Sequence, residues 1–134
     1  MGFARSLATL HIIFVATGAN ASEVLDGDAF RQATEGQTIV YSNSGGVYGI
    51  EQYLRQNRVL WQTAPGECQF GRWYSDAGAI CFEYEDRTAP SCWTMTREAN
   101  GLVARLVTEG ESFVLREVGR QTEPLNCPGP KVGT

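Results

Sequence analysis

The feature that most constrains the fold is a series of short strand-like runs that fills the chain from residue 38 onward. Each run is rich in β-branched and aromatic residues, and turn-forming residues separate it from the next at intervals of roughly ten, as in all-β meanders and barrels. None of the connections is long enough for a crossover helix, so consecutive strands should pair antiparallel. The eight predicted strands cover residues 38–42, 47–54, 58–63, 68–74, 79–85, 91–97, 102–107 and 112–118. They predict a mainly β fold of about eight antiparallel strands, either a barrel or a strongly curved meander sheet.

A short helix is expected before the first strand. Asp26 is a suitable N-cap, Ala29, Phe30 and Ala33 recur at helical spacing, and Gly36 is a suitable stop. In a closed barrel, such a helix would plug one end.

The tail from residue 119 to the C-terminus cannot continue a central strand, because it contains Pro124, Pro128 and Pro130. We expect it to lie across the outside of the sheet, pinned through Cys127. Within the sheet, Pro65–Gly66 predicts a type II turn.

The first 21 residues have the pattern of an export signal. Arg5 precedes an apolar stretch of about a dozen residues, and "ANA" at 19–21 is a suitable cleavage site. The apolar stretch is too short to cross a bilayer as a helix, so we expect no stable membrane insertion after cleavage. The prediction is a signal peptide at 1–21, a single mature domain at 22–134, and a soluble periplasmic or secreted protein.

Cleavage would remove His11, the only histidine, together with Arg5, and leave 10 basic against 15 acidic residues, a net charge of −5. Without imidazole, the mature chain cannot form a Ser-His or Cys-His nucleophile pair or an ordinary histidine zinc site. An acidic chain whose single lysine is Lys131 is also unsuited to nucleic acid or an anionic membrane, since both recruit dense positive charge.

The four cysteines predict two disulfides, because an even number in a small exported domain is typical of a disulfide framework. A hairpin whose tip lies between Asp86 and Arg87 places Cys81 opposite Cys92, and the second bridge then joins the remaining two residues. The alternatives are a four-thiolate metal site and a redox-active pair. Both lack the C-x-x-C spacing that such sites use, so neither a metal nor another cofactor is expected. The four residues are Cys68, Cys81, Cys92 and Cys127.

The chain is rich in aromatic residues, which ordinarily means core packing. An eight-stranded barrel can also hold one small apolar ligand in its interior. Under that hypothesis, the ligand-binding residues are Trp61, Trp73, Tyr84 and Trp93.

One acidic cluster offers a possible catalytic pair. Glu83 and Glu85 share a strand face at a spacing that glycoside hydrolysis could use. Two glutamates on the outward face of a strand are ordinarily solvated, and Arg72 is placed to pair with Glu83 across a hairpin. We therefore predict no catalytic residue and no enzymatic activity.

The runs "YGIEQYL", "GECQFGRWY", "ICFEYED", "CW" and "PLNCPGP" resemble a family of small exported alphaproteobacterial proteins of unknown function. The resemblance covers nearly all of the chain from about Phe30. It implies the family's fold and two disulfides, and it supplies no catalytic residue.

The sequence thus favours a non-enzymatic binding or interaction module, whose ligand is a small apolar or aromatic molecule. The alternative is an inhibitor or accessory protein that binds a protein partner. A small acid-dependent hydrolase that uses Glu83 or Glu85 is the third hypothesis.

Overall fold

The computed structural model describes residues 1–2, 11–15, 18, 22–63 and 67–127. The expected cleavage site at 19–21, the turn at Pro65–Gly66 and the last two tail prolines lie outside these residues. No helix in the described part of the chain is long and apolar enough to span a membrane.

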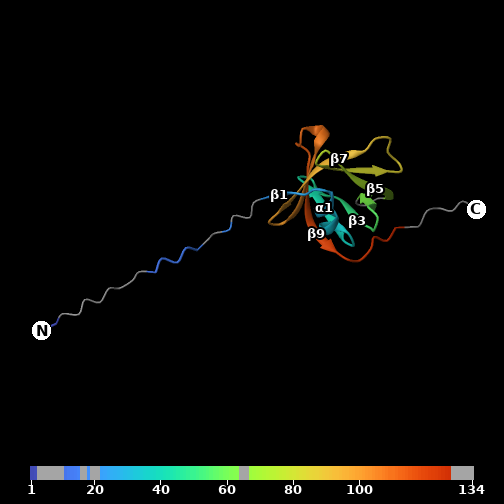
Figure 1. Cartoon of the computed structure of the whole chain (residues 1–134). Coiled ribbons are helices and arrows are strands. Elements are labelled where there is room, and N and C mark those ends of the chain that lie inside the picture. The colour runs from blue at the N-terminus through green and yellow to red at the C-terminus, as the bar shows by residue number, and fades with distance from the viewer. Residues whose placement is uncertain (3–10, 16–17, 19–21, 64–66, 128–134) are drawn as a thin grey trace, which may run out of the picture.

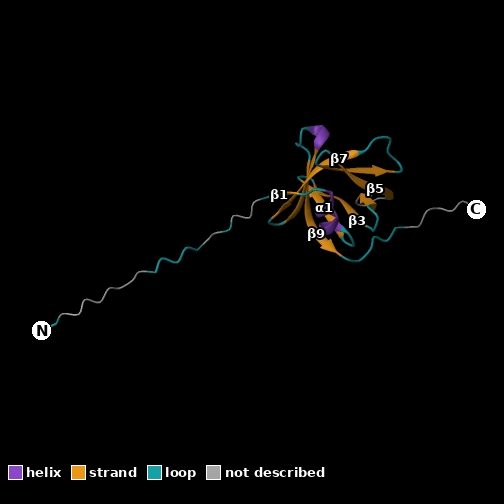
Figure 2. Cartoon of the chain, in the orientation of Figure 1, coloured by secondary structure: helices purple, strands orange, loops and turns teal. Residues whose placement is uncertain are grey.

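The regular secondary structure is mainly β-strand (Figures 1 and 2). Two helical segments are present in the described ranges, the helix α1 (Gly27–Thr34) and the 3-10 turn η1 (Val107–Glu109). The strands are β1 (Glu23–Val24), β2 (Thr38–Asn43), β3 (Gly46–Tyr53), β4 (Arg58–Thr63), β5 (Cys68–Asp76), β6 (Ala79–Tyr84), β7 (Ser91–Glu98), β8 (Gly101–Leu106) and β9 (Val114–Gln121).

Strands β2 to β9 form a closed antiparallel barrel. Each pairs with the next along the chain, and β9 returns to pair with β2. The predicted eight-stranded barrel is therefore confirmed. The sequence did not predict strand β1. This strand pairs with the second half of β7, beyond the residues of β7 that pair with β6.

Helix α1 closes one end of the barrel. The Asp26 carboxylate caps it by accepting a hydrogen bond from the Ala29 amide at 2.8 Å, so the predicted cap is confirmed. The Phe30 ring is fully buried and meets three rings edge-on, those of Tyr53, Trp73 and Phe82, at centroid distances of 5.6, 5.0 and 6.2 Å. This edge-on packing is the favoured geometry of aromatic pairs and makes the helix end of the barrel a filled core.

Strand β9 is tied to the same helix by Arg120. Its guanidinium donates to the Ala33 carbonyl at 2.6 Å, near the C-terminal end of α1, and pairs with the Glu117 carboxylate at 2.7 Å. Burial alone would raise the pKa of Glu117. The hydrogen bonds from Arg120 and from the Leu102 amide nevertheless hold that pKa below its usual value.

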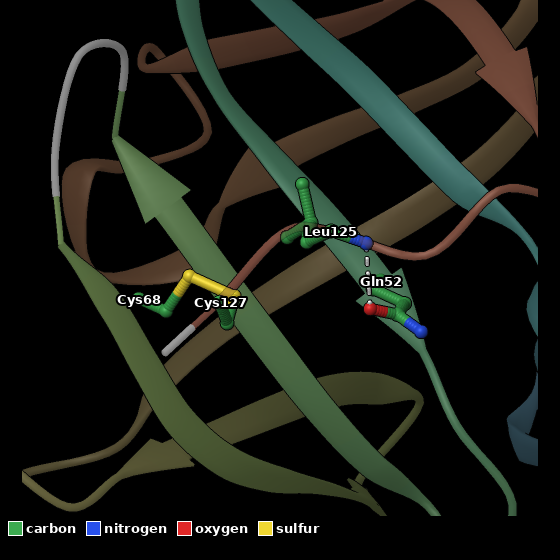
Figure 3. Close-up of a disulfide and its surroundings, with 4 residues drawn as sticks. All are labelled: Gln52, Cys68, Leu125 and Cys127. Atoms are coloured by element: carbon green, nitrogen blue, oxygen red, sulfur yellow. Dashed lines mark hydrogen bonds between the residues drawn. A yellow bond between two sulfur atoms is a disulfide. The ribbon is translucent and has the colours of Figure 1, made fainter. Parts of the chain in front are cut away.

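Strand β9 runs to Gln121, three residues into the predicted tail, and beyond it the tail crosses the outside of the barrel as predicted (Figure 3). It is fastened by the Cys68–Cys127 disulfide, and the Leu125 amide donates to the Gln52 side-chain oxygen at 3.0 Å. The tail therefore joins the outer faces of β3 and β5.

The second disulfide confirms the predicted hairpin register. Cys81 and Cys92 are direct cross-strand partners with Cα atoms 3.9 Å apart. Cys81 lies on the same strand face as Glu83, which pairs with Arg72 of β5 at 3.1 Å as the sequence also predicted. Cys81 is nevertheless buried, with 1% of its surface exposed.

Candidate functional site

A cavity of about 60 Å³ lies inside the barrel and is open to solvent. Its inner wall includes Tyr53 on β3 and Phe82 on β6, the residues that meet the Phe30 plug. At its other end lie Tyr48 on β3 and Trp93 on β7, with Arg87 in the connection between β6 and β7. Tyr48 is five residues from Tyr53, or roughly 16 Å along a strand, so the mouth faces away from the helix. The full lining is Tyr41, Tyr48, Glu51, Tyr53, Trp61, Phe82, Tyr84, Arg87, Ser91, Trp93, Met95, Ala104 and Leu115.

An aromatic ledge lies at the mouth. It is formed by Tyr48, Trp93 and Phe113, and the Phe113 ring lies 5.4 Å from the first and 6.0 Å from the second. Tyr48 is 38% exposed, while Trp93 and Phe113 are partly buried. An apolar group at the mouth would therefore find a partly solvated aromatic surface.

Two glycines let the aromatic rings of Trp61 and Tyr84 pack closely against the backbone of the barrel wall. The Trp61 indole on β4 covers the backbone of Gly49 on β3 so closely that a Cβ there would overlap the ring. A Cβ at Gly71 would collide first with the Glu83 carbonyl oxygen and then with Cδ1 of the Tyr84 ring, which lies 2.7 Å from where it would stand. The absence of a side chain at each glycine therefore leaves room for an aromatic ring of the cavity wall.

Glu51 is the chemically distinctive residue of the cavity. It lies on β3 opposite Trp61 of β4, and only 2% of its surface is exposed. Tyr84 donates its hydroxyl to the carboxylate, at 2.9 and 3.1 Å from the two oxygens. The neighbouring hydroxyls of Tyr41 and Tyr53 are paired with each other at 2.9 Å. In the described part of the chain, the Glu51 carboxylate therefore accepts from one hydroxyl group, although a carboxylate can accept several hydrogen bonds.

Burial raises the pKa of the Glu51 carboxyl well above its usual value, because removal from water penalises the charged form. The hydrogen bond from Tyr84 and the positive charge of Arg87 offset only part of this cost. Arg87 itself is exposed and lies over the Tyr84 ring, with its guanidinium carbon 5.6 Å from the ring centroid. Glu51 is thus a buried acid close to a solvated cation at the mouth.

Three of the four predicted ligand-binding residues line this cavity, namely Trp61, Tyr84 and Trp93. Trp73 does not line it. Its ring packs against Phe30 at the helix end, and the Arg31 guanidinium lies 5.5 Å from the ring centroid. Trp73 belongs to the plug because it faces α1 from the far end of β5.

The two glutamates considered as a catalytic pair lie on the solvated outer face, as the sequence predicted. Glu83 has 42% of its side chain exposed and pairs with Arg72, and Glu85 is exposed. Both lie on an open groove outside the barrel. Glu51, which the sequence analysis missed, lies two residues before the aromatic Tyr53. That spacing puts both on one strand face, which was the available signal.

No cluster of histidine, cysteine or acidic side chains able to hold a metal is present among the described residues. All four cysteines are in disulfides. The cavity therefore offers hydrogen bonding, aromatic contact and one ionisable acid.

Comparison of the chain with protein-family models, with curated proteins and with solved structures finds no match.

Proposed function

We propose that the protein is an exported, non-enzymatic binding module that holds one end of a small apolar or aromatic ligand in the barrel cavity. The observation that carries this proposal is the solvent-open cavity with aromatic walls. A filled barrel would need no opening, whereas small barrels that bind ligands use their interior for it.

The size of the cavity limits the ligand. A cavity of about 60 Å³ has room for roughly two to four water molecules, and a fully enclosed benzene ring needs about 150 Å³. Only a small terminal group would enter, and the rest of the ligand would lie on the aromatic ledge formed by Tyr48, Trp93 and Phe113.

Export is part of the proposal. It is supported by the signal-like residues 1–21 and by the two disulfides, which persist in oxidising compartments and are rare in the cytosol. Amino-terminal sequencing of the protein recovered from the periplasm would test it, and we expect Ser22 as the first residue. Recovery of the uncleaved chain from the cytoplasm would contradict it.

The cavity contains a convenient reporter. Met95 is the only methionine after residue 21, it lines the cavity, and 2% of its surface is exposed. A sample with 13C-labelled methionine methyl groups therefore gives one resonance from the domain. We expect titration with 2-phenylethanol, a neutral aromatic probe, to shift this resonance saturably.

An external binding site would leave the Met95 resonance in place and would contradict the proposal. A variant that fills the cavity, Ala104→Leu, supplies the control, because Ala104 is a small residue of the cavity wall. The variant should fold and lose the saturable shift.

A further inference from the structure

We propose that the group entering the cavity is a primary ammonium, and that it pairs with Glu51 while the aromatic body of the ligand lies on the ledge at the mouth. The inference rests on the proposed function and adds the charge of the ligand. Its basis is the placement of a carboxylate inside an aromatic cavity that is open to solvent.

The geometry around Glu51 suits a small cation. Glu51 lines the cavity, and among the described residues it is the Tyr84 hydroxyl that donates to its two carboxylate oxygens. An ammonium has three donors and no acceptor, so it can fill the unused acceptor positions. A neutral apolar group at the same place would leave these positions unpaired, which is costly in a buried site.

The walls favour the same class of ligand. The rings of Tyr41 on β2 and Trp61 on β4 line the cavity on the strands beside Glu51, and Tyr53 lines it from the same strand as Glu51. Aromatic faces attract cations, and aromatic cages commonly recognise ammonium groups. The net charge of −5 on the mature chain also attracts cations toward the protein.

The groups that face Glu51 decide how binding depends on pH. They are Tyr84 on β6, Tyr41 on β2, Tyr53 on β3, and Arg87 in the connection between β6 and β7. The three tyrosines stay neutral, since burial raises their pKa values. Arg87 repels a cation, but it is exposed, so water screens its charge and its side chain can move aside.

Binding should therefore be linked to loss of a proton. Over the pH range in which burial keeps Glu51 protonated in the empty cavity, an arriving ammonium pairs with the carboxylate, and the carboxyl proton leaves to solvent. The amine keeps its own proton, because alkylammonium groups titrate near pH 10. No covalent bond changes.

The test is isothermal titration calorimetry of the mature protein at pH 7 with three probes of similar shape: phenethylamine, 2-phenylethanol and 3-phenylpropionate. We expect the amine to bind at least about tenfold more tightly than the alcohol, because a charge-assisted hydrogen bond is gained. Titration in two buffers of different ionisation enthalpy, repeated at several pH values between 5 and 8, should show proton release that approaches one per amine bound below the raised pKa of Glu51 and declines above it.

Glu51→Gln is the decisive variant, since it keeps the shape of the side chain and removes the charge. It should bind amine and alcohol within about twofold of each other and release no proton. The matched control is Glu83→Gln, which removes a carboxylate from the outer surface and should retain the preference of the wild type.

The outcomes separate the two claims. If alcohol and amine bind equally well to the wild type, or if Glu51→Gln keeps the amine preference, the ammonium inference fails and the binding module stands. Tighter binding of 3-phenylpropionate also overturns the inference, because it would assign the charge recognition to Arg87. If none of the probes binds, both claims fail. Should Glu51→Gln not fold, the ranking of the three probes on the wild type still decides.

Discussion

The burial of Glu51 makes a quantitative prediction about stability. An unfolded glutamate titrates near pH 4.3, whereas burial raises the pKa of Glu51 in the folded protein well above its usual value. Between these two pKa values the folded state holds a proton that the unfolded state has lost. The free energy of unfolding must therefore fall as the pH rises through this window.

The size of the effect follows from the linkage of one proton. While Glu51 is protonated in the folded state and ionised in the unfolded state, each pH unit lowers the free energy of unfolding by about 1.4 kcal/mol. Two units within the window cost about 2.7 kcal/mol, a large share of the roughly 5–15 kcal/mol that stabilises a domain of this kind. Glu51→Gln lacks this proton and should lose this part of the pH dependence.

The assay is urea unfolding followed by tryptophan fluorescence, with wild type and Glu51→Gln compared at half-unit steps between pH 5 and pH 8. The free energy of Glu51→Gln minus that of the wild type should increase with pH, because other titrating groups cancel in the difference. Glu83→Gln is again the control, since its exposed ion pair is worth only about 0–1 kcal/mol. A difference that stays constant across the range would show that Glu51 titrates alike in both states and would refute the reasoning.

Two further predictions concern the disulfide that holds the tail and the close packing of Trp61 on Gly49. Replacing Cys68 and Cys127 together by serine opens a loop whose ends are 59 residues apart in the sequence. In the chain-entropy model, this double replacement should lower the free energy of urea unfolding by about 4 kcal/mol. An unchanged unfolding midpoint would show that the tail does not need its bridge. Gly49→Ala should destabilise the protein by about 1–3 kcal/mol and alter its near-ultraviolet circular dichroism, because the new methyl group displaces Trp61. Gly119→Ala is the matched strand control, since its Cβ would meet Val40 only at 3.7 Å, and equal effects of the two variants would contradict this explanation.

Much of the fold was predictable because local signals agree with one another. Turn residues at intervals of about ten and the absence of long connections set the strand order, and the tip between Asp86 and Arg87 set the register that pairs Cys81 with Cys92. These are nearest-neighbour relations along the chain. The closing pair, β9 with β2, follows once eight strands curve into a barrel.

The candidate site was less predictable because it depends on which strand face turns inward. Trp61 and Trp73 both face the interior, and alternation alone did not show that Trp73 lies at the helix end against Phe30 while Trp61 lines the cavity. The burial of Glu51 is a property of the closed barrel. Acids are seldom fully buried, so the strand pattern alone does not indicate that Glu51 lies inside, and the facing strands of the closed barrel place it there.

The measurement that tests the account most directly is a crystal structure of the mature protein soaked with phenethylamine. We predict that the ligand nitrogen lies about 3 Å from a carboxylate oxygen of Glu51, with the phenyl ring against Tyr48, Trp93 and Phe113. A cavity that holds only ordered water in those crystals, with the amine bound on the outer surface, would contradict the account.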